Sequence, residues 1–223
     1  MEQVLVDKFM KSLQTQEKGT SRTTFRVDKV DLDTLTDLLT KAYSFQVRKR
    51  NGECEITPDL GKKINASANW LISGQKPGLL LFGSVGSGKT TLARAMAQVV
   101  NYLYYAVWSM DRKEVAEVSA TKLTKLLTSG EKDGEEMFER YKTKEMLFID
   151  DLGLEPAMVK NFGNEILPIV ELLYFRHDRM LFTICTSNLD MNDFEQKYGK
   201  RIASRFYEMF NRIGFTGDDY RKR

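Results

Sequence analysis

Short apolar runs alternate with segments of helical periodicity from residue 78 onward. Three nearly continuous apolar runs occupy residues 79–82, 146–149 and 181–185, and each has the length and composition of a buried parallel strand. After the first run, apolar residues recur at helical spacing up to about residue 110. This alternation predicts an α/β fold in which helices flank a parallel sheet.

Weaker patterns complete the predicted order of elements. Residues 115–118 suggest a further strand, residues 121–127 a helix and residues 129–134 a polar loop. A later helix is predicted from its apolar positions, which are Phe162, Ile166, Ile169, Val170 and Leu173, with Pro168 kinking its first half. The last helical pattern covers residues 193–210 and breaks near Gly199.

The first quarter of the chain has a different pattern. Residues 1–59 predict a small helical extension that acts as an adaptor, and residues 60–223 predict a single α/β domain. Within the extension, a helix is expected from residue 33 or 34 to residue 47. Trp70 is expected to pack against the larger domain. We expect no separate helical lid domain after the sheet.

The stretch between the first strand and its helix, GSVGSGKT, matches the phosphate-binding pattern G-x-x-x-x-G-K-[ST]. Its glycines let the backbone turn N–H groups inward, and the following helix start adds partial positive charge. Lys89 is expected to neutralise the β- and γ-phosphates of a nucleoside triphosphate, and Thr90 to reach a bound Mg²⁺. The predicted nucleotide-binding residues are Gly83, Ser84, Val85, Gly86, Ser87, Gly88, Lys89, Thr90 and Thr91.

Acidic and amide side chains follow the next two apolar runs. Asp150 comes directly after residues 146–149 and is expected to hold Mg²⁺, directly or through water. Asp151 is expected to orient or deprotonate the attacking water. Asn188 follows the third run and is expected to hold the same water beside the γ-phosphate. Asp-Asp and Thr-Ser-Asn are also common at turns, so these assignments depend on the phosphate loop.

Two arginines lie in the last helical pattern. Arg201 and Arg205 are four residues apart and therefore share one helical face. An arginine suits the charge that develops on a γ-phosphate, and a neighbouring subunit often supplies it. Spacing alone favours an ordinary solvated basic face.

Composition sets the outer bounds. The 42% of hydrophobic residues can bury one full core, and 34 basic against 31 acidic residues create no overall field that would require nucleic acid. Cys54 and Cys185 match no metal-ligand spacing, and Cys185 is expected to be a reduced, buried thiol. Because no signal-peptide pattern and no membrane-length apolar run is found, we expect a cytoplasmic protein without membrane contact.

Together these motifs resemble those of AAA+ ATPases of the P-loop NTPase class. More narrowly, residues 60–220 are similar to bacterial DnaC-type replicative helicase loaders and to IstB-type transposition helper ATPases. The resemblance rests on GSVGSGKT, LFIDDLG, FGNEILPIVELLYFRHDR followed by TSN, YGKRIASRF and, near the end, GDDYR. All P-loop proteins share the first motif, whereas the combination is much more specific.

The resemblance implies an Mg²⁺-dependent ATPase of DNA replication whose ATP-bound subunits assemble head to tail. It implies that Asn188 is the sensor-1 residue and that Arg205 is the arginine finger, with Arg201 as the second choice. It further implies binding of single-stranded DNA and contact with a replicative helicase through the N-terminal extension. The sensor-2 arginine of a C-terminal lid is missing or replaced, and Arg221 is the candidate replacement.

Other functions stay open at this point. A transposition helper ATPase would act with a transposase instead of a helicase. A nucleotide-gated binding module would use ATP to switch partner affinity with negligible hydrolysis. A small-molecule kinase is disfavoured, because nothing in the sequence suggests a lid over an acceptor substrate.

Overall fold

The computed structural model describes residues 24–50, 52–108, 114–128, 133–161 and 164–216, together with Val6, Lys8 and Met10. Phe162, predicted to belong to a helix, and Arg221, the candidate sensor-2 residue, lie outside the described residues.

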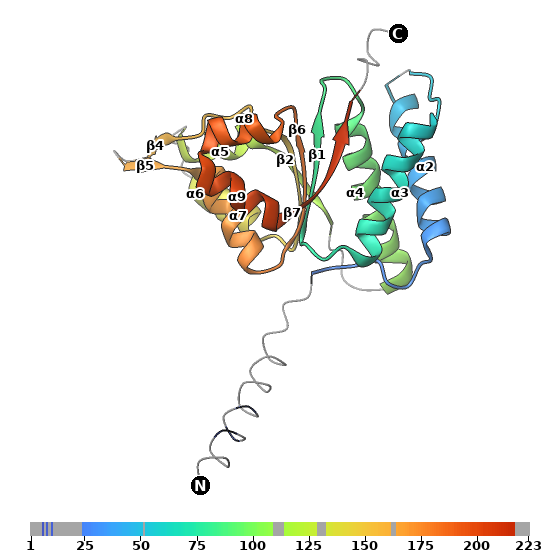
Figure 1. Ribbon diagram of the computed structural model, residues 1–223, viewed down its shortest axis with the longest axis horizontal. Coiled ribbons are helices and arrows are strands. Elements are labelled where there is room, and N and C mark those ends of the chain that lie inside the picture. Colours follow the sequence, from blue (N-terminus) through green and yellow to red (C-terminus); the bar gives the residue numbers. More distant parts are fainter. Residues whose placement is uncertain are drawn as a thin grey trace.

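A five-stranded parallel sheet forms the centre of the fold (Figure 1). Its strands are β1 (Gly78–Gly83), β2 (Ala116–Ser119), β3 (Met146–Leu152), β6 (Phe182–Ser187) and β7 (Phe210–Phe215). They lie in the order β2-β3-β6-β1-β7, so β6 separates β1 from β3. Because parallel strands end at the same edge, the carboxyl ends of β1, β6 and β3 are neighbours. The predicted α/β class with a parallel sheet is confirmed.

Helices cover both faces of the sheet, and a separate hydrophobic cluster fills the space under each face (Figure 1). One face carries α2 (Leu32–Arg48), α3 (Pro58–Ser73) and α4 (Lys89–Trp108). The other face carries α5 (Ala120–Thr128), α6 (Gly134–Thr143), α7 (Pro168–Asp178), α8 (Met191–Tyr198) and α9 (Lys200–Met209). Among the described residues, no helix is both long and apolar enough to span a bilayer.

Of the helices that precede the sheet, α3 packs onto it and α2 packs against α3 and α4 (Figure 1). The carboxylate of Asp31 caps the start of α2. Leu35 of α2 is fully buried in the same cluster as Leu92 of α4. The Trp70 ring on α3 lies 5.0 Å from the Phe182 ring of β6, which is the packing that the sequence predicts. Both sides of residue 60 therefore contribute to one core, and the division of the chain at that residue stays a prediction.

The segment from residue 159 to residue 178 differs from its prediction. It contains an antiparallel strand pair and then a helix, whereas the sequence pattern predicts one helix kinked at Pro168. The strands are β4 (Val159–Asn161) and β5 (Asn164–Ile166). Pro168 is the first residue of α7. Proline has no N–H to donate and a fixed φ that suits the first helical turn, so it begins the helix here and does not kink it.

Two elements, α6 and the edge strand β7, have no counterpart in the predicted order. β7 begins at Phe210, where the sequence pattern predicts helix. Only its first and last residues, Phe210 and Phe215, are buried, so β7 lacks the continuous apolar run of a central strand. The predicted break at Gly199 is confirmed, because this residue separates α8 from α9 and has a φ of +87°.

Candidate nucleotide-binding site

β1 leads into a tight loop that ends at Lys89, the first residue of α4. The lysine is only 6% exposed, because its side chain turns back over the loop. Its Nζ donates hydrogen bonds to the carbonyl oxygens of Gly83 at 2.8 Å and of Ser84 at 2.6 Å. The Ser87 hydroxyl donates to the same Ser84 carbonyl at 2.6 Å. The predicted phosphate loop is therefore one closed strand–loop–helix turn with the ammonium group at its centre.

Two neighbouring elements hold this loop at positions that only glycine fits. Gly83 and Gly88 have φ angles of +122° and +95°. A Cβ on Gly83 would lie 2.1 Å from the carbonyl oxygen of Phe215 at the end of β7, and the Ser84 N–H donates to that oxygen at 2.9 Å. A Cβ on Gly88 would lie 2.4 Å from the hydroxyl oxygen of Tyr43 on α2. The loop thus contacts both the edge strand and an N-terminal helix.

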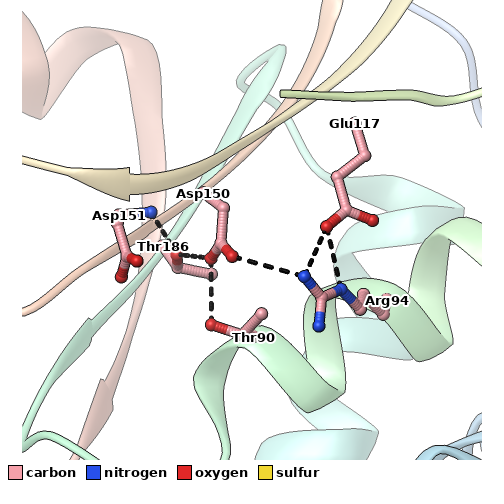
Figure 2. Close-up of polar contacts among 6 residues, drawn as sticks. All are labelled: Thr90, Arg94, Glu117, Asp150, Asp151 and Thr186. Carbon is pink, nitrogen blue, oxygen red and sulfur yellow. Dashed lines mark hydrogen bonds and ion pairs between the residues drawn. The ribbon is translucent and has the colours of Figure 1, made fainter. Parts of the chain in front are cut away.

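Asp150 lies near the carboxyl end of β3 and faces the start of α4 (Figure 2). Its Oδ1 accepts hydrogen bonds from the Thr90 hydroxyl at 2.9 Å and from the Thr186 hydroxyl at 2.6 Å. Thr90 comes from α4 and Thr186 from β6, so three elements meet at one carboxylate. The structure therefore brings together Thr90 and Asp150, the two residues that the sequence predicts as magnesium ligands.

Asp151 occupies an irregular point of β3. Its φ of +56° lies in the left-handed region, and the pairing of β3 with β6 shifts register between Ile149 and Leu152. The Asp151 N–H donates to the Thr186 hydroxyl oxygen at 3.0 Å (Figure 2). One hydroxyl of β6 therefore holds the backbone of Asp151 and the carboxylate of Asp150.

Asn188 directly follows Ser187, the last residue of β6, and is half-buried. β6 lies between β1 and β3, so its carboxyl end opens between the phosphate loop and Asp150. Asn188 is thus at the same edge of the sheet as the predicted phosphate-binding and acidic residues.

Residues 79–210 match the profile of the "ATPase family associated with various cellular activities (AAA)". The chain belongs to this AAA family. A search of curated protein sequences found no significant match.

Three solved structures illustrate the proteins that share this fold. AMPPCP-bound DnaA from Aquifex aeolicus has a TM-score of 0.54 at 18% identity, over 76% of this chain and 50% of the DnaA chain. DnaI has a TM-score of 0.55 at 23% identity, over 74% of this chain and 85% of its own. A candidate primosome component from Streptococcus pyogenes serotype M3 has a TM-score of 0.54 at 20% identity, over 73% and 83%. At these identities the likeness establishes a shared fold, and this chain spans only half of the DnaA chain.

The two predicted finger arginines of this AAA protein lie away from its own phosphate loop. Arg201 and Arg205 are exposed on α9, which covers the opposite face of the sheet from α4 (Figure 1). The Arg205 guanidinium carbon lies 4.6 Å from the ring centre of Tyr174 on α7. The structure therefore presents both arginines outward, on the far side from the loop that starts α4.

The sequence pattern does not predict the charged pair that lies beside Asp150. Arg94 of α4 donates from Nε and Nη2 to Glu117 Oε1 of β2, at 2.8 and 2.6 Å, and its Nη2 lies 3.7 Å from Asp150 Oδ2 (Figure 2). Arg94 has one usable signal, since it follows Thr90 by four residues and so shares its helical face. The sequence contains no comparable indication for Glu117, because its position near Asp150 depends on how β2 pairs with β3.

A buried carboxylate connects the loop after β3 to α8. Glu155 is 1% exposed and accepts hydrogen bonds from the Gly153 N–H at 2.8 Å and from the Tyr198 hydroxyl. Burial raises the pKa of Glu155 above its ordinary value. Burial also raises the pKa of Tyr198, which keeps its phenol protonated and able to donate. The segment after Asp151 is thereby fastened to the helix that precedes the two arginines.

Proposed function

We propose that this AAA protein binds ATP with Mg²⁺ at residues 83–91 and hydrolyses it. The observation that carries the proposal is the hydrogen bond of 2.9 Å between Thr90 and Asp150. This bond lies next to the loop in which Lys89 is buried. These groups come from separate elements, and each has the chemistry that a magnesium–triphosphate complex requires. Membership of the AAA family supports the same reaction class.

The donor set fits Mg²⁺. A hydroxyl and a carboxylate supply the oxygen ligands that this ion prefers. Among the described residues, no group of three or more His, Cys, Asp and Glu side chains could hold a metal by itself. Such a site suits an ion that takes its other ligands from phosphate and water. When bound, Mg²⁺ would neutralise charge on the phosphates beside Thr90 and Asp150.

The side chains have distinct proposed roles. Lys89 exchanges its two carbonyl partners for β- and γ-phosphate oxygens, while the backbone amides of the loop and the N-terminus of α4 face the phosphate chain. Asp151 orients or deprotonates the attacking water, and Asn188 holds that water from the adjacent strand. Arg205, with Arg201 as the second choice, completes the site of a neighbouring copy, since both arginines face away from their own loop.

The biological role that we propose is loading or remodelling of a replicative helicase on single-stranded DNA by an ATP-dependent oligomer. The motif set of DnaC-type loaders supports this role, and the N-terminal extension, residues 1–59, is the proposed contact for the protein partner. We place this activity in the cytoplasm. The alternatives are a transposition helper ATPase and an ATP-gated switch with little turnover.

Calorimetric titration with ATP·Mg²⁺ tests the foundation of this proposal. The wild-type protein should bind, and Lys89→Ala should lose at least about a hundredfold in affinity, because charge-assisted hydrogen bonds to the phosphates disappear. Lys41→Ala, which changes an exposed lysine of α2, is the matched control and should bind normally. A wild-type protein that produces no binding heat from micromolar to millimolar nucleotide would rule out the proposed site.

A second experiment separates the biological alternatives. Asp151→Asn should stall with ATP bound and retain its partners, which mass spectrometry can identify after purification. Recovery of a helicase supports the loader, and recovery of a transposase supports the transposition helper. Comparison of ATP turnover with ATP-dependent oligomerisation tests the switch, which requires oligomerisation without turnover.

A further inference from the structure

Arg94 and Glu117 form a charged pair next to the carboxylate of Asp150 (Figure 2). Two guanidinium nitrogens of Arg94 share one oxygen of Glu117, at 2.8 and 2.6 Å. The same Nη2 lies 3.7 Å from Asp150 Oδ2, which is beyond a hydrogen bond. Arg94 is therefore hydrogen-bonded to Glu117, whereas its ion pair with Asp150 is longer.

The helical repeat of α4 and the alternation of side chains along the strands bring Arg94, Glu117 and Asp150 together. Thr90 and Arg94 are one turn apart on the same face of α4. On the sheet, Glu117 pairs with Phe148, and Ser119 pairs with Asp150. Because alternate residues of paired strands share a face, Glu117 projects from the same face of the sheet as Asp150, the face that α4 covers.

The two oxygens of Asp150 have different environments. Oδ1 accepts from the hydroxyls of Thr90 and Thr186, whereas Oδ2 faces the guanidinium of Arg94. A rotation of the Arg94 side chain would shorten this ion pair from 3.7 Å to hydrogen-bonding distance. The two hydrogen bonds to Glu117 hold Arg94 back, because they fix the guanidinium against a nearer carboxylate.

We propose that Glu117 restrains Arg94 and thereby controls how strongly Arg94 competes with Mg²⁺ for the carboxylate of Asp150. Arg94 and Glu117 are positioning residues in this scheme, and neither touches the nucleotide. The inference rests on the proposed magnesium–nucleotide site and adds to it a pair that adjusts its metal requirement. Loss of Glu117 lets Arg94 move closer to Asp150 and strengthens their ion pair, whereas loss of Arg94 removes the competitor.

The experiment measures the Mg²⁺ concentration that gives half-maximal binding of a fluorescent ATP analogue. Glu117→Gln should raise this midpoint by about three- to fivefold, which is the scale of a partly exposed ion pair. Arg94→Gln should lower it. The double variant should return to the wild-type midpoint or below it, because Glu117 acts only through Arg94. Pairing of Mg²⁺ with the free analogue is the same for every variant and cancels from the comparison.

A remote ion pair provides the control. Glu136 and Arg140 form an exposed i,i+4 pair on α6, and Glu136→Gln should leave the midpoint unchanged. Circular dichroism melting of each variant shows that the fold is retained.

Two outcomes overturn the inference. One is a wild-type midpoint in both Glu117→Gln and Arg94→Gln, and the other is a double variant that keeps the raised midpoint of Glu117→Gln. A wild-type protein that binds no analogue at any Mg²⁺ concentration would instead defeat the proposed function itself, so the two failures are distinguishable.

Discussion

The phosphate loop at the start of α4 and the helix α9 belong to different parts of the molecule, because α4 and α9 cover opposite faces of the sheet, and they differ in how their charged groups are held. At the loop, Lys89 is buried and bonded to two carbonyls, and Asp150 accepts from two hydroxyls. On α9, Arg201 and Arg205 are exposed, and the Arg205 guanidinium lies over the Tyr174 ring. One region is preorganised within the chain, whereas the other presents free charge outward. The difference is what a site divided between two copies requires, with the phosphate-binding half and the arginine half on separate surfaces.

The two regions are nevertheless connected. Glu155, which follows Asp151 by four residues, is bonded to Tyr198 at the end of α8. The Phe194 ring of α8 lies 5.1 Å from the Phe206 ring of α9. The loop after Asp151 is therefore linked to α9 by the buried hydrogen bond between Glu155 and Tyr198 and by the aromatic contacts of α8 with Phe206.

Arg205→Ala should have the largest effect and tests the exposed half of the comparison. We expect ATP binding within about twofold of wild type but turnover reduced by about 10³-fold, the usual contribution of an arginine finger. Steady-state phosphate release and calorimetry measure the two quantities. The control is Arg179→Ala, which changes another exposed arginine stacked on an aromatic ring of the same face and should leave turnover intact.

Mixing makes this test sharper. Lys89→Ala retains its arginines but lacks a working loop, and Arg205→Ala has the reverse defect. If the arginine acts on a neighbouring copy, an equimolar mixture should hydrolyse ATP faster than either variant alone. A mixture that stays at the sum of its parts would place the finger elsewhere, and Arg201→Ala is then the next variant to test.

Thr186→Val should have an intermediate effect and tests the preorganised half. The buried hydroxyl donates to Asp150 and accepts from the Asp151 N–H, so its loss removes both of these hydrogen bonds. We expect a loss of about 1–3 kcal/mol in the free energy of unfolding, measured by urea denaturation. Thr124→Val removes a buried hydroxyl that donates only to a helix carbonyl, and should cost less than about 1 kcal/mol. Equal costs for the two substitutions would show that the site is not preorganised by Thr186.

Glu155→Gln should have the smallest effect and tests the connection between the regions. Burial raises the pKa of Glu155 in the folded state, so the stabilising contribution of this group is fully present below its unfolded pKa. That contribution is lost as the pH rises through the folded pKa. The difference in unfolding free energy between wild type and Glu155→Gln should therefore shrink or reverse from acid to neutral pH. A difference that does not vary with pH would contradict the raised pKa.

Local sequence determined the elements that carry the chemistry. Three apolar runs and the helical spacing after the first one were enough to predict β1, β3, β6 and α4, because buried strands and helices impose distinct periodicities. The glycines, lysine and threonine of residues 83–90 could be assigned from their pattern alone, since the loop depends on contacts within a few residues. The proximity of Asp150 to Thr90 followed from the rule that parallel strands end at one edge.

Only the tertiary structure decided what surrounds those elements. β7 has no continuous apolar run, and it is a strand because β1 supplies its hydrogen-bonding partners. Tyr43 against Gly88, and Glu117 beside Arg94, depend on contacts between segments far apart in the chain. No local periodicity encodes such contacts, because they arise when separate hydrophobic faces pack onto a common sheet. The sequence therefore determined the closed loop around Lys89, for which we propose phosphate binding, and the packing of the chain determined the neighbours of that loop and the outward position of Arg201 and Arg205.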